Sequence, residues 1–266
     1  MPFKYLPEDR VDVLQNMKIR FSPLASFNDP FESLPLVDFP ERHERVEEME
    51  KSLRKIPSSQ LPDDHDEEFL QEFVAVYRTG LEKHLNPSAY GAKVIGELKD
   101  KFSVLSLSRT NNSLLMWSHY ASEGSGFVLS FDKNHSFIQS NITDDHPRGP
   151  TPVLYSRNRP IYPNPETVVL DELFCHKPIE WAYEEEERLF HYYEPDEQII
   201  GKDSYGENIR LTELPASVIN GIYFGYNARN ELIEMVQKCM KKNKIECALF
   251  KGHMHSMEYK IVFEKM

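Results

Sequence analysis

Hydrophobic and polar residues alternate in several short stretches of the chain, a pattern that is typical of strands with a buried face. The strands predicted in this way cover residues 3–6, 18–21, 102–108, 127–131, 153–155, 218–224, 245–250 and 259–263. Capping residues and helical spacing of apolar residues predict helices at 9–15, 114–121, 166–175 and 229–241. Because strands and helices alternate, with several separations of hairpin length, we expect an α+β fold with a mixed, mostly antiparallel sheet flanked by helices.

Residues 40–100 depart from this alternation, because they are rich in charged and helix-forming residues. Pro57 and Pro62 interrupt the segment and separate its first helix from the next. The helices expected here are 42–55, one that begins at 63–67, and one at 88–99. We interpret the segment as a helical insertion, either a lid or a cover, within a single domain spanning residues 1–266.

The composition narrows the classes of partner. The 266 residues carry a formal net charge of -12, which argues against broad binding to nucleic-acid backbones but leaves room for a local basic groove. The spacing of Cys175, Cys239 and Cys247 suggests neither a disulfide framework nor a zinc site. No stretch approaches the roughly 20 apolar residues of a membrane span, and the N-terminus shows no export signal. We therefore expect a cytoplasmic protein with no membrane partner.

The stretch 176–190 places four consecutive glutamates next to an arginine and two large aromatic residues. If it enters a strand, its side chains alternate between the two faces. One face then carries Trp181, Tyr183, Glu185, Glu187 and Leu189, and the other carries Glu184, Glu186, Arg188 and Phe190. The second face has the composition of a site, in which Arg188 keeps an acid ionised. The alternative is an acidic edge strand that its charge keeps soluble.

The segment Phe27-Asn28-Asp29-Pro30-Phe31-Glu32 predicts a fixed turn. Asn28 and Asp29 can each bond to the backbone two residues on, and Pro30 disfavours a helical conformation for Asp29. The structural interpretation is an Asx-type turn anchored in the core by the two phenylalanines. The functional interpretation is a turn that presents Asp29 or Glu32 to a pocket.

Histidines give only weak indications of chemistry. His119 lies on a predicted helix facing Leu115 and Met116, which favours a packed histidine, while the alternative is a polar group beside a glycine-rich turn that a ligand approaches. His253 and His255 share one strand face but have no third metal ligand at a recognisable spacing. No Walker loop, nucleophile elbow, zinc-protease helix or dinucleotide fingerprint is present.

Three motifs, taken in order, resemble one known family. They are the turn at 27–32, the segment Met116-Trp117-Ser118-His119-Tyr120-Ala121 with Gly126-Phe127 after it, and Lys177 followed by Trp181, Tyr183, Glu184, Glu186 and Arg188. Their order and identity resemble the bacterial domain-of-unknown-function family 2971, and the resemblance covers most of the chain. It says least about the helical stretch before residue 100, where that family varies most.

A strand that opens on Tyr-Glu-x-Glu-x-Arg, late in a compact mixed sheet, also looks like the glutamate strand of ADP-ribosyltransferases, and some members of the family look like phage-defence or toxin proteins. This likeness implies an ADP-ribosyltransferase-like fold and a transferase that uses NAD as its substrate. Such an enzyme moves ADP-ribose to a macromolecular acceptor, protein or nucleic acid, or cleaves NAD. One glutamate holds the nicotinamide-ribose hydroxyl and stabilises an oxocarbenium-like centre as nicotinamide leaves.

The same likeness implies roles for particular residues. The expected catalytic residues are Glu186, Glu184 and His119. The expected NAD-binding residues are Tyr5, Arg20, Asn28, Asp29, Trp117, Tyr120, Trp181, Tyr183 and Arg188. Among them the aromatic residues Tyr183 and Trp181 are candidates to stack on nicotinamide or adenine, and Arg20 and Arg188 to meet the pyrophosphate. The first strand departs from the enzyme class, because Lys4 and Tyr5 stand where an arginine or histidine is usual.

Two other functions remain open from the residues. In the first, the protein is a non-catalytic module whose charged motifs pair in a buried network and fix the fold. The members of that network are Asp29, Glu32, His119, Glu184, Glu186 and Arg188. In the second, it is a hydrolase or nuclease whose acids surround a metal, although no ligand set of recognisable spacing supports this.

Overall fold

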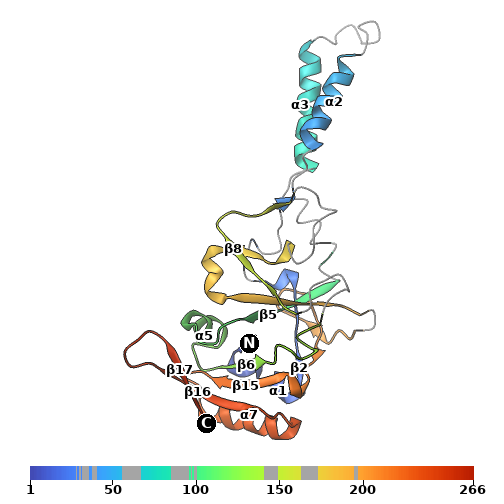
Figure 1. The fold of residues 1–266 in the computed structure, drawn as a ribbon. Coiled ribbons are helices and arrows are strands. Elements are labelled where there is room, and N and C mark those ends of the chain that lie inside the picture. Colours follow the sequence, from blue (N-terminus) through green and yellow to red (C-terminus); the bar gives the residue numbers. More distant parts are fainter. Residues whose placement is uncertain are drawn as a thin grey trace.

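The chain forms a large sheet with helices on both faces and a helical pair that extends away from the sheet (Figure 1). The computed structural model describes residues 1–27, 29, 31, 36–37, 41–55, 67–84, 96, 98, 101–140, 149–162, 173–194 and 197–266. Both ends of the chain lie in the body that contains the sheet, far from the tip of the helical pair (Figure 1).

Among the described residues, nine strands form the large sheet. They are β1 (Phe3–Leu6), β3 (Ser22–Pro23), β5 (Phe102–Ser108), β6 (Phe127–Phe131), β7 (Thr151–Pro152), β11 (Glu186–Tyr192), β15 (Ile219–Phe224), β16 (Ala248–Met254) and β17 (Ile261–Lys265). Their order is β17-β16-β15-β6-β1-β5-β11-β7, and β3 also pairs with β5. The pairings are antiparallel except for β15 with β16. The predicted α+β class with a mixed, mostly antiparallel sheet is therefore confirmed.

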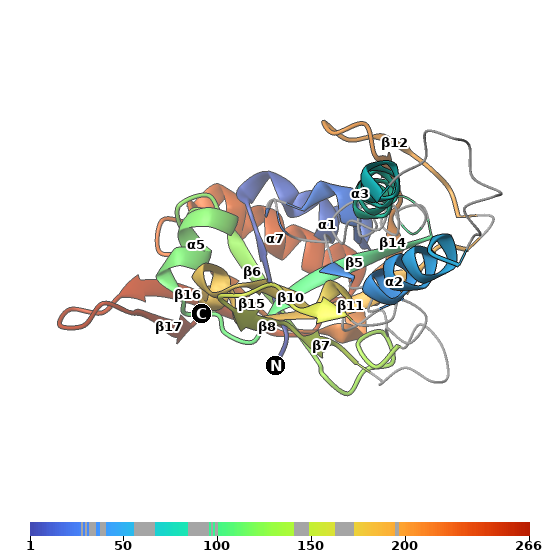
Figure 2. The same ribbon diagram turned by 90° about the horizontal axis from the view of Figure 1, so that it is seen from above.

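Strand β6 is buried on both faces because helices cover both faces of the sheet. All five residues of β6 are buried. Phe127 and Leu129 belong to a core cluster that includes α1 (Asp12–Asn16) and α7 (Asn230–Asn243), whereas Val128 points the other way, towards α5 (Leu114–Tyr120). Figure 2 shows α1 and α7 next to each other. The site described below lies on the α5 side.

Helix α7 connects two parallel strands, β15 and β16, which require a crossover rather than a hairpin. Its buried residues Leu232, Ile233, Val236 and Cys239 recur at helical spacing and form the stripe that packs on the sheet. The helix ends where Lys244 takes a left-handed conformation with φ 55°. This amphipathic pattern is why the helix could be predicted from the sequence.

Short elements surround the large sheet. Pairs of short strands are β10 (His176–Pro178) with β8 (Leu154–Ser156), β12 (Gly201–Lys202) with β13 (Asn208–Ile209), β14 (Thr212–Glu213) with β2 (Lys18–Ile19), and β4 (Leu36–Val37) with β9 (Ile161–Tyr162). Short 3-10 helices are η1 (Glu8–Val11), η2 (Leu24–Ser26), η5 (Ile179–Glu184) and η6 (Ala216–Val218). Of these, β10 and η5 supply residues to the site.

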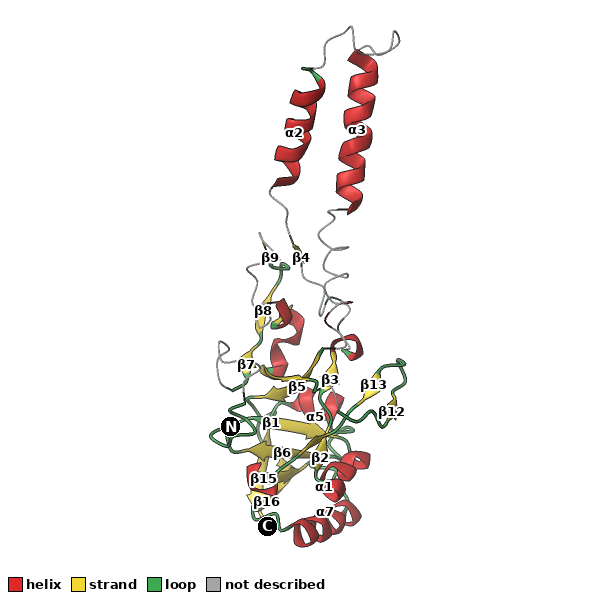
Figure 3. Ribbon diagram, turned by 90° about the vertical axis from the view of Figure 1, so that its right-hand side faces the viewer, coloured by secondary structure: helices red, strands yellow, loops and turns green. Residues whose placement is uncertain are grey.

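Helices α2 (Glu41–Leu53) and α3 (Glu67–His84) lie within the segment expected to be a helical insertion. They pack side by side, with Val46 buried, and project from the body (Figures 1 and 3). The helices expected at 88–99 and 166–175 fall largely outside the described residues. No helix in the described part of the chain is long and apolar enough to cross a membrane.

The predicted strand over residues 181–190 is wrong in its first half. Residues up to Glu184 form η5, Glu185 takes a left-handed conformation with φ 44°, and β11 begins only at Glu186. Trp181 and Tyr183 therefore do not lie on the strand. The alternative of a solvated acidic edge strand does not hold either, because Glu186 is 3% exposed and Arg188 is 0% exposed.

Candidate functional site

A cavity of about 270 Å³ lies on the α5 side of the sheet. Strands β1, β5, β10 and β11, helices α5 and η5, and the chain between Ser22 and Phe27 all contribute to its wall. The polar groups that line it include Lys4, Ser106, Tyr120, Lys177, Glu184 and Glu186. Segments that are far apart in the sequence therefore bring two acids and two amines to the wall of one cavity.

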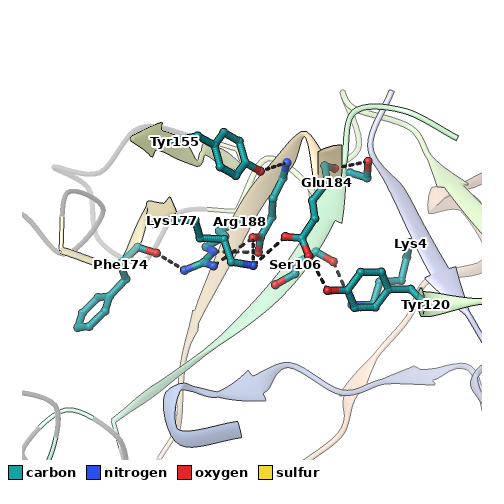
Figure 4. Close-up of polar contacts among 10 residues, drawn as sticks. Lys4, Ser106, Tyr120, Tyr155, Phe174, Lys177, Glu184 and Arg188 are labelled. Carbon is teal, nitrogen blue, oxygen red and sulfur yellow. Dashed lines mark hydrogen bonds and ion pairs between the residues drawn. The ribbon is translucent and has the colours of Figure 1, made fainter. Parts of the chain in front are cut away.

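Glu186 and Arg188 form the inner part of the charged cluster. They point to the same side of β11, because alternate residues of a strand share a face. The Arg188 Nε lies 2.9 Å from Glu186 Oε1, and another guanidinium nitrogen lies 3.1 Å from Oε2. The guanidinium also donates to the Phe174 carbonyl (Figure 4), and it lies 4.9 Å from the centre of the Phe27 ring. Burial lowers the pKa of Arg188 to about 9, partly offset by Asp29.

Lys177 joins the two acids. Its Nζ, from β10, donates to Glu184 Oε2 at 2.7 Å and to Glu186 Oε2 at 3.0 Å (Figure 4). Burial alone lowers the pKa of Lys177, but attraction to Glu186 and Glu184 outweighs this and raises the pKa above its ordinary value. The lysine therefore stays charged between the carboxylates.

Glu184 forms the outer part of the cluster. Its Oε1 accepts a hydrogen bond of 2.5 Å from the Tyr120 hydroxyl of α5, and its backbone carbonyl accepts one of 2.7 Å from Ser108 Oγ (Figure 4). The left-handed residue Glu185 turns the chain immediately afterwards, so that Glu184 and Glu186 both reach Lys177 from different elements. The local break in the strand is thus what brings the two acids together.

Glu186 and Lys4 have pKa values shifted by burial. Burial raises the pKa of Glu186, and the positive charge of Lys177 partly offsets this rise. The Lys4 Nζ donates to the Ser106 carbonyl at 3.0 Å, and burial lowers the pKa of Lys4 to about 8, partly offset by Glu186. Both shifts have the same physical cause, because burial disfavours the charged form of each group.

Part of the chain matches a known family. Residues 116–189 match the family model described as Protein of unknown function (DUF2971). The DUF2971 segment contains α5, β10, η5 and the start of β11, and so supports the family expected from the second and third motifs. The first motif, at 27–32, lies outside it. No curated protein and no solved structure matches the chain.

Four of the predicted site residues line the cavity, and a fifth lies directly behind it. The four are Tyr5, Tyr120, Glu184 and Glu186. The fifth is Arg188, which is held against Glu186. The Tyr5 hydroxyl donates to the Thr110 carbonyl at 3.1 Å, and burial raises the pKa of Tyr5 above its ordinary range. Its ring is therefore available to the cavity, while its hydroxyl is engaged with the backbone.

The predicted turn around Asp29 is present in part. Asp29 is buried, and its Oδ1 accepts a hydrogen bond from the backbone nitrogen of Phe31 at 3.0 Å, as an Asx-type turn requires. Its Oδ2 has no hydrogen-bond partner among the described residues. Asp29 acts on the cluster through its charge on Arg188. Asn28, Pro30 and Glu32 lie outside the described residues.

Other predicted residues lie away from the cavity. His119 is exposed, not packed as its helical neighbours had suggested, because α5 turns its Leu115 face to solvent. Its ring lies 6.0 Å from that of Tyr183, which in turn lies 6.2 Å from that of Trp181. These three rings form a row outside the cavity, and the Lys177 Nζ lies 5.2 Å from the centre of the Trp181 ring.

Trp117 and Arg20 have structural partners. Trp117 is fully buried, donates from Nε1 to the Asn111 carbonyl at 2.7 Å, and packs edge-on against Tyr5. Arg20 forms an ion pair of 2.7 Å with Asp203. Neither residue lines the cavity.

Lys4, Ser106 and Phe27 line the cavity but were not predicted as site residues. Lys177 appeared in the third motif but was given no role. A usable signal existed for Lys4, because a lysine between Phe3 and Tyr5 on a central strand must place a charge within the fold. The serines of β5 gave a similar signal, since small polar residues on a buried strand leave room beside it.

Proposed function

We propose that the cavity binds the nicotinamide-ribose end of NAD, and that the protein is an ADP-ribosyltransferase-like enzyme that breaks the bond between nicotinamide and ribose. The ADP-ribose passes to a macromolecular acceptor, protein or nucleic acid, or to water. The observation that carries the proposal is the Glu184 carboxylate, which lies on the cavity wall between the Tyr120 hydroxyl and the Lys177 ammonium.

The chemistry of NAD suits a carboxylate. Nicotinamide is positively charged while it is attached to ribose and neutral once it leaves, so its departure needs no proton. The electrons of the broken bond go to the ring nitrogen, and positive charge develops on the ribose carbon and ring oxygen. A carboxylate held beside that carbon stabilises this charge. The acceptor oxygen then bonds to the carbon and gives its proton to the carboxylate.

Glu184 suits this role better than Glu186. Both carboxylate oxygens of Glu186 are engaged by Arg188 or Lys177, and Arg188 has no exposed surface. Among the described residues, the side-chain partners of Glu184 are Tyr120 and Lys177, which both line the cavity. We therefore assign Glu184 to the reacting carbon, and Glu186 with Arg188 to the orientation of Lys177.

The size of the cavity suits part of a dinucleotide. Pockets that enclose drug-sized ligands span about 300–1,000 Å³, so a space of about 270 Å³ suits nicotinamide and its ribose but not the whole of NAD. The motifs also resemble those of phage-defence and toxin proteins. We therefore propose that the protein is a bacterial effector that depletes NAD or modifies a macromolecule.

A second candidate function is a non-catalytic module stabilised by the charged cluster. The observation that favours it is the complete pairing of Lys177, Glu184, Glu186 and Arg188 among themselves and with neighbouring groups. A fully paired buried network can fix a fold without any ligand.

The two functions separate in an assay of NAD consumption. Wild type is incubated with NAD labelled in its adenine, and both released nicotinamide and label transferred to protein or RNA are measured. Glu184→Gln is expected to lower the rate by about 100-fold or more, the usual cost of losing a preorganised electrostatic group. Glu185→Gln is the matched control, because Glu185 is an exposed neighbour. A wild type that consumes no NAD, together with a Glu184→Gln variant that unfolds, would favour the non-catalytic module.

A further inference from the structure

A second and larger cavity, of about 500 Å³, adjoins the first. It lies where β10, the segment 156–160 and the residues Phe31 and Leu36 meet. The pairing of β4 with β9, at Leu36 with Ile161, holds two of these parts together. Lys177 lines both cavities and therefore lies at their boundary.

The second cavity gathers positive charge in an acidic protein. Arg157, Arg159, His176 and Lys177 all line it, whereas Glu180 is the one acid among the described residues of its lining. The chain as a whole has a net charge of -12, so this local excess of cations is not what the composition alone would give. Arginine side chains present planar, bidentate donors that match phosphate oxygens.

The cavity also offers an aromatic surface. The Phe31 ring is 55% exposed and lies 5.8 Å from the Arg159 guanidinium carbon. Pro160 and Pro178 contribute further apolar lining. An exposed ring beside two arginines is suited to a planar base with phosphates attached, because the base stacks on the ring while the phosphates reach the guanidinium groups.

We propose that this second cavity binds the ADP part of NAD, with Arg157 and Arg159 as phosphate partners and Phe31 as the stacking partner of the adenine. The inference rests on the proposed function for the identity of the whole nucleotide. With both cavities, there is room for the whole of NAD, which the first cavity alone does not offer. The dinucleotide would pass Lys177, with its nicotinamide ribose in the first cavity and its ADP in the second.

The test uses ADP as the probe, because ADP binding needs no cleavage. Titration calorimetry on the full chain is expected to show ADP binding to wild type that weakens at least tenfold in the Arg157→Gln/Arg159→Gln double variant. Binding should be unchanged in Arg229→Gln, a control arginine that pairs with Glu8 on the surface. Far-ultraviolet circular dichroism and melting confirm that each variant is folded.

The outcomes separate this inference from the proposed function. If ADP does not bind wild type, or binds the folded double variant as tightly as wild type, the inference is overturned. NAD cleavage with an unchanged KM in the double variant also overturns it and leaves the catalytic proposal standing. Arginine-dependent ADP binding to a wild type that cleaves no NAD supports the inference and overturns only the catalytic proposal.

Discussion

The two ends of the charged cluster use the same kinds of residue in different surroundings. At the inner end, Arg188 is fully buried and engages both oxygens of Glu186, with Phe27 and the Phe174 carbonyl around it. At the outer end, Glu184 meets Tyr120 on the wall of a cavity. Lys177 joins the two ends.

This difference teaches that charge alone does not mark a site. The inner pair has no space beside the guanidinium, and removal of one partner would leave an uncompensated charge in the interior. Both carboxylates line the cavity, but the partners of the outer one, Tyr120 and Lys177, line it as well, whereas Arg188 does not. The inner end therefore serves mainly to hold the outer end in place.

The largest effect is expected at the inner end. Arg188→Met removes the guanidinium and leaves Glu186 with Lys177 as its remaining cation, so we expect a loss of about 3–5 kcal/mol in the free energy of unfolding. Urea denaturation measures it. The double variant Glu186→Met/Arg188→Met should be more stable than Arg188→Met alone, because it removes the uncompensated charge as well. If Arg188→Met is as stable as wild type, the inner end of the cluster does not stabilise the fold as we expect.

Lys4, on the wall of the cavity, should make the stability of the protein depend on pH. Its folded pKa of about 8 lies below the ordinary value of 10.5, so the unfolded chain binds more protons between these pH values. Stability should therefore rise with pH from about 8 to about 10.5, relative to a Lys4→Met variant, by on the order of 3 kcal/mol. The measurement is the difference between the two unfolding free energies across this range. A difference that does not change with pH would show that the amine is not desolvated.

A smaller effect is expected for the hydroxyl at the outer end. Tyr120→Phe removes the donor to Glu184 but keeps the ring, so the free energy of unfolding should fall by about 1–2 kcal/mol. If Glu184 acts on NAD, the same variant should lower the rate of nicotinamide release, because the carboxylate loses one of the groups that orient it. Thermal melting and the release assay are run on the same preparation. A large loss of stability with no change in rate would place Tyr120 in the structural part of the cluster.

The smallest effect is expected for an ion pair on the surface. Arg229 and Glu8 form a contact of 2.9 Å with largely exposed side chains. Solvent and salt screen such a pair, so Arg229→Ala should leave the melting temperature close to that of wild type. A loss comparable to that of Arg188→Met would mean that burial does not explain the difference between the ion pairs.

Much of the fold could be predicted from the sequence because its pattern is local. The aromatic stretch of β1, the alternation in β5, the apolar run of β6 and the apolar stripe of α7 each depend on neighbouring residues. Ser113 caps α5 by accepting a hydrogen bond from the Met116 nitrogen. The strand at 181–190 was misplaced because one residue, Glu185, takes a left-handed conformation that glutamate rarely adopts. The alternation of residue types continues past Glu185 in the sequence, but the extended strand does not.

The candidate site could be predicted only in part, for a related reason. Glu184, Glu186 and Arg188 are close in the sequence, so their grouping was visible. Lys4 joins them through the pairing of β1 with β5, which brings its amine to the Ser106 carbonyl across a separation of about a hundred residues. Such long-range contacts depend on strand order, which neither spacing nor composition determines.

The most direct test of the account combines two measurements on one protein, Glu184→Gln. If the outer end is a site, the variant should remain folded, with a free energy of unfolding about 1–3 kcal/mol below that of wild type, because glutamine preserves the shape of the side chain but loses the charge that pairs with Lys177. In the same preparation, nicotinamide release from NAD should fall by about 100-fold or more. A fully folded variant that releases nicotinamide at the wild-type rate would contradict the account.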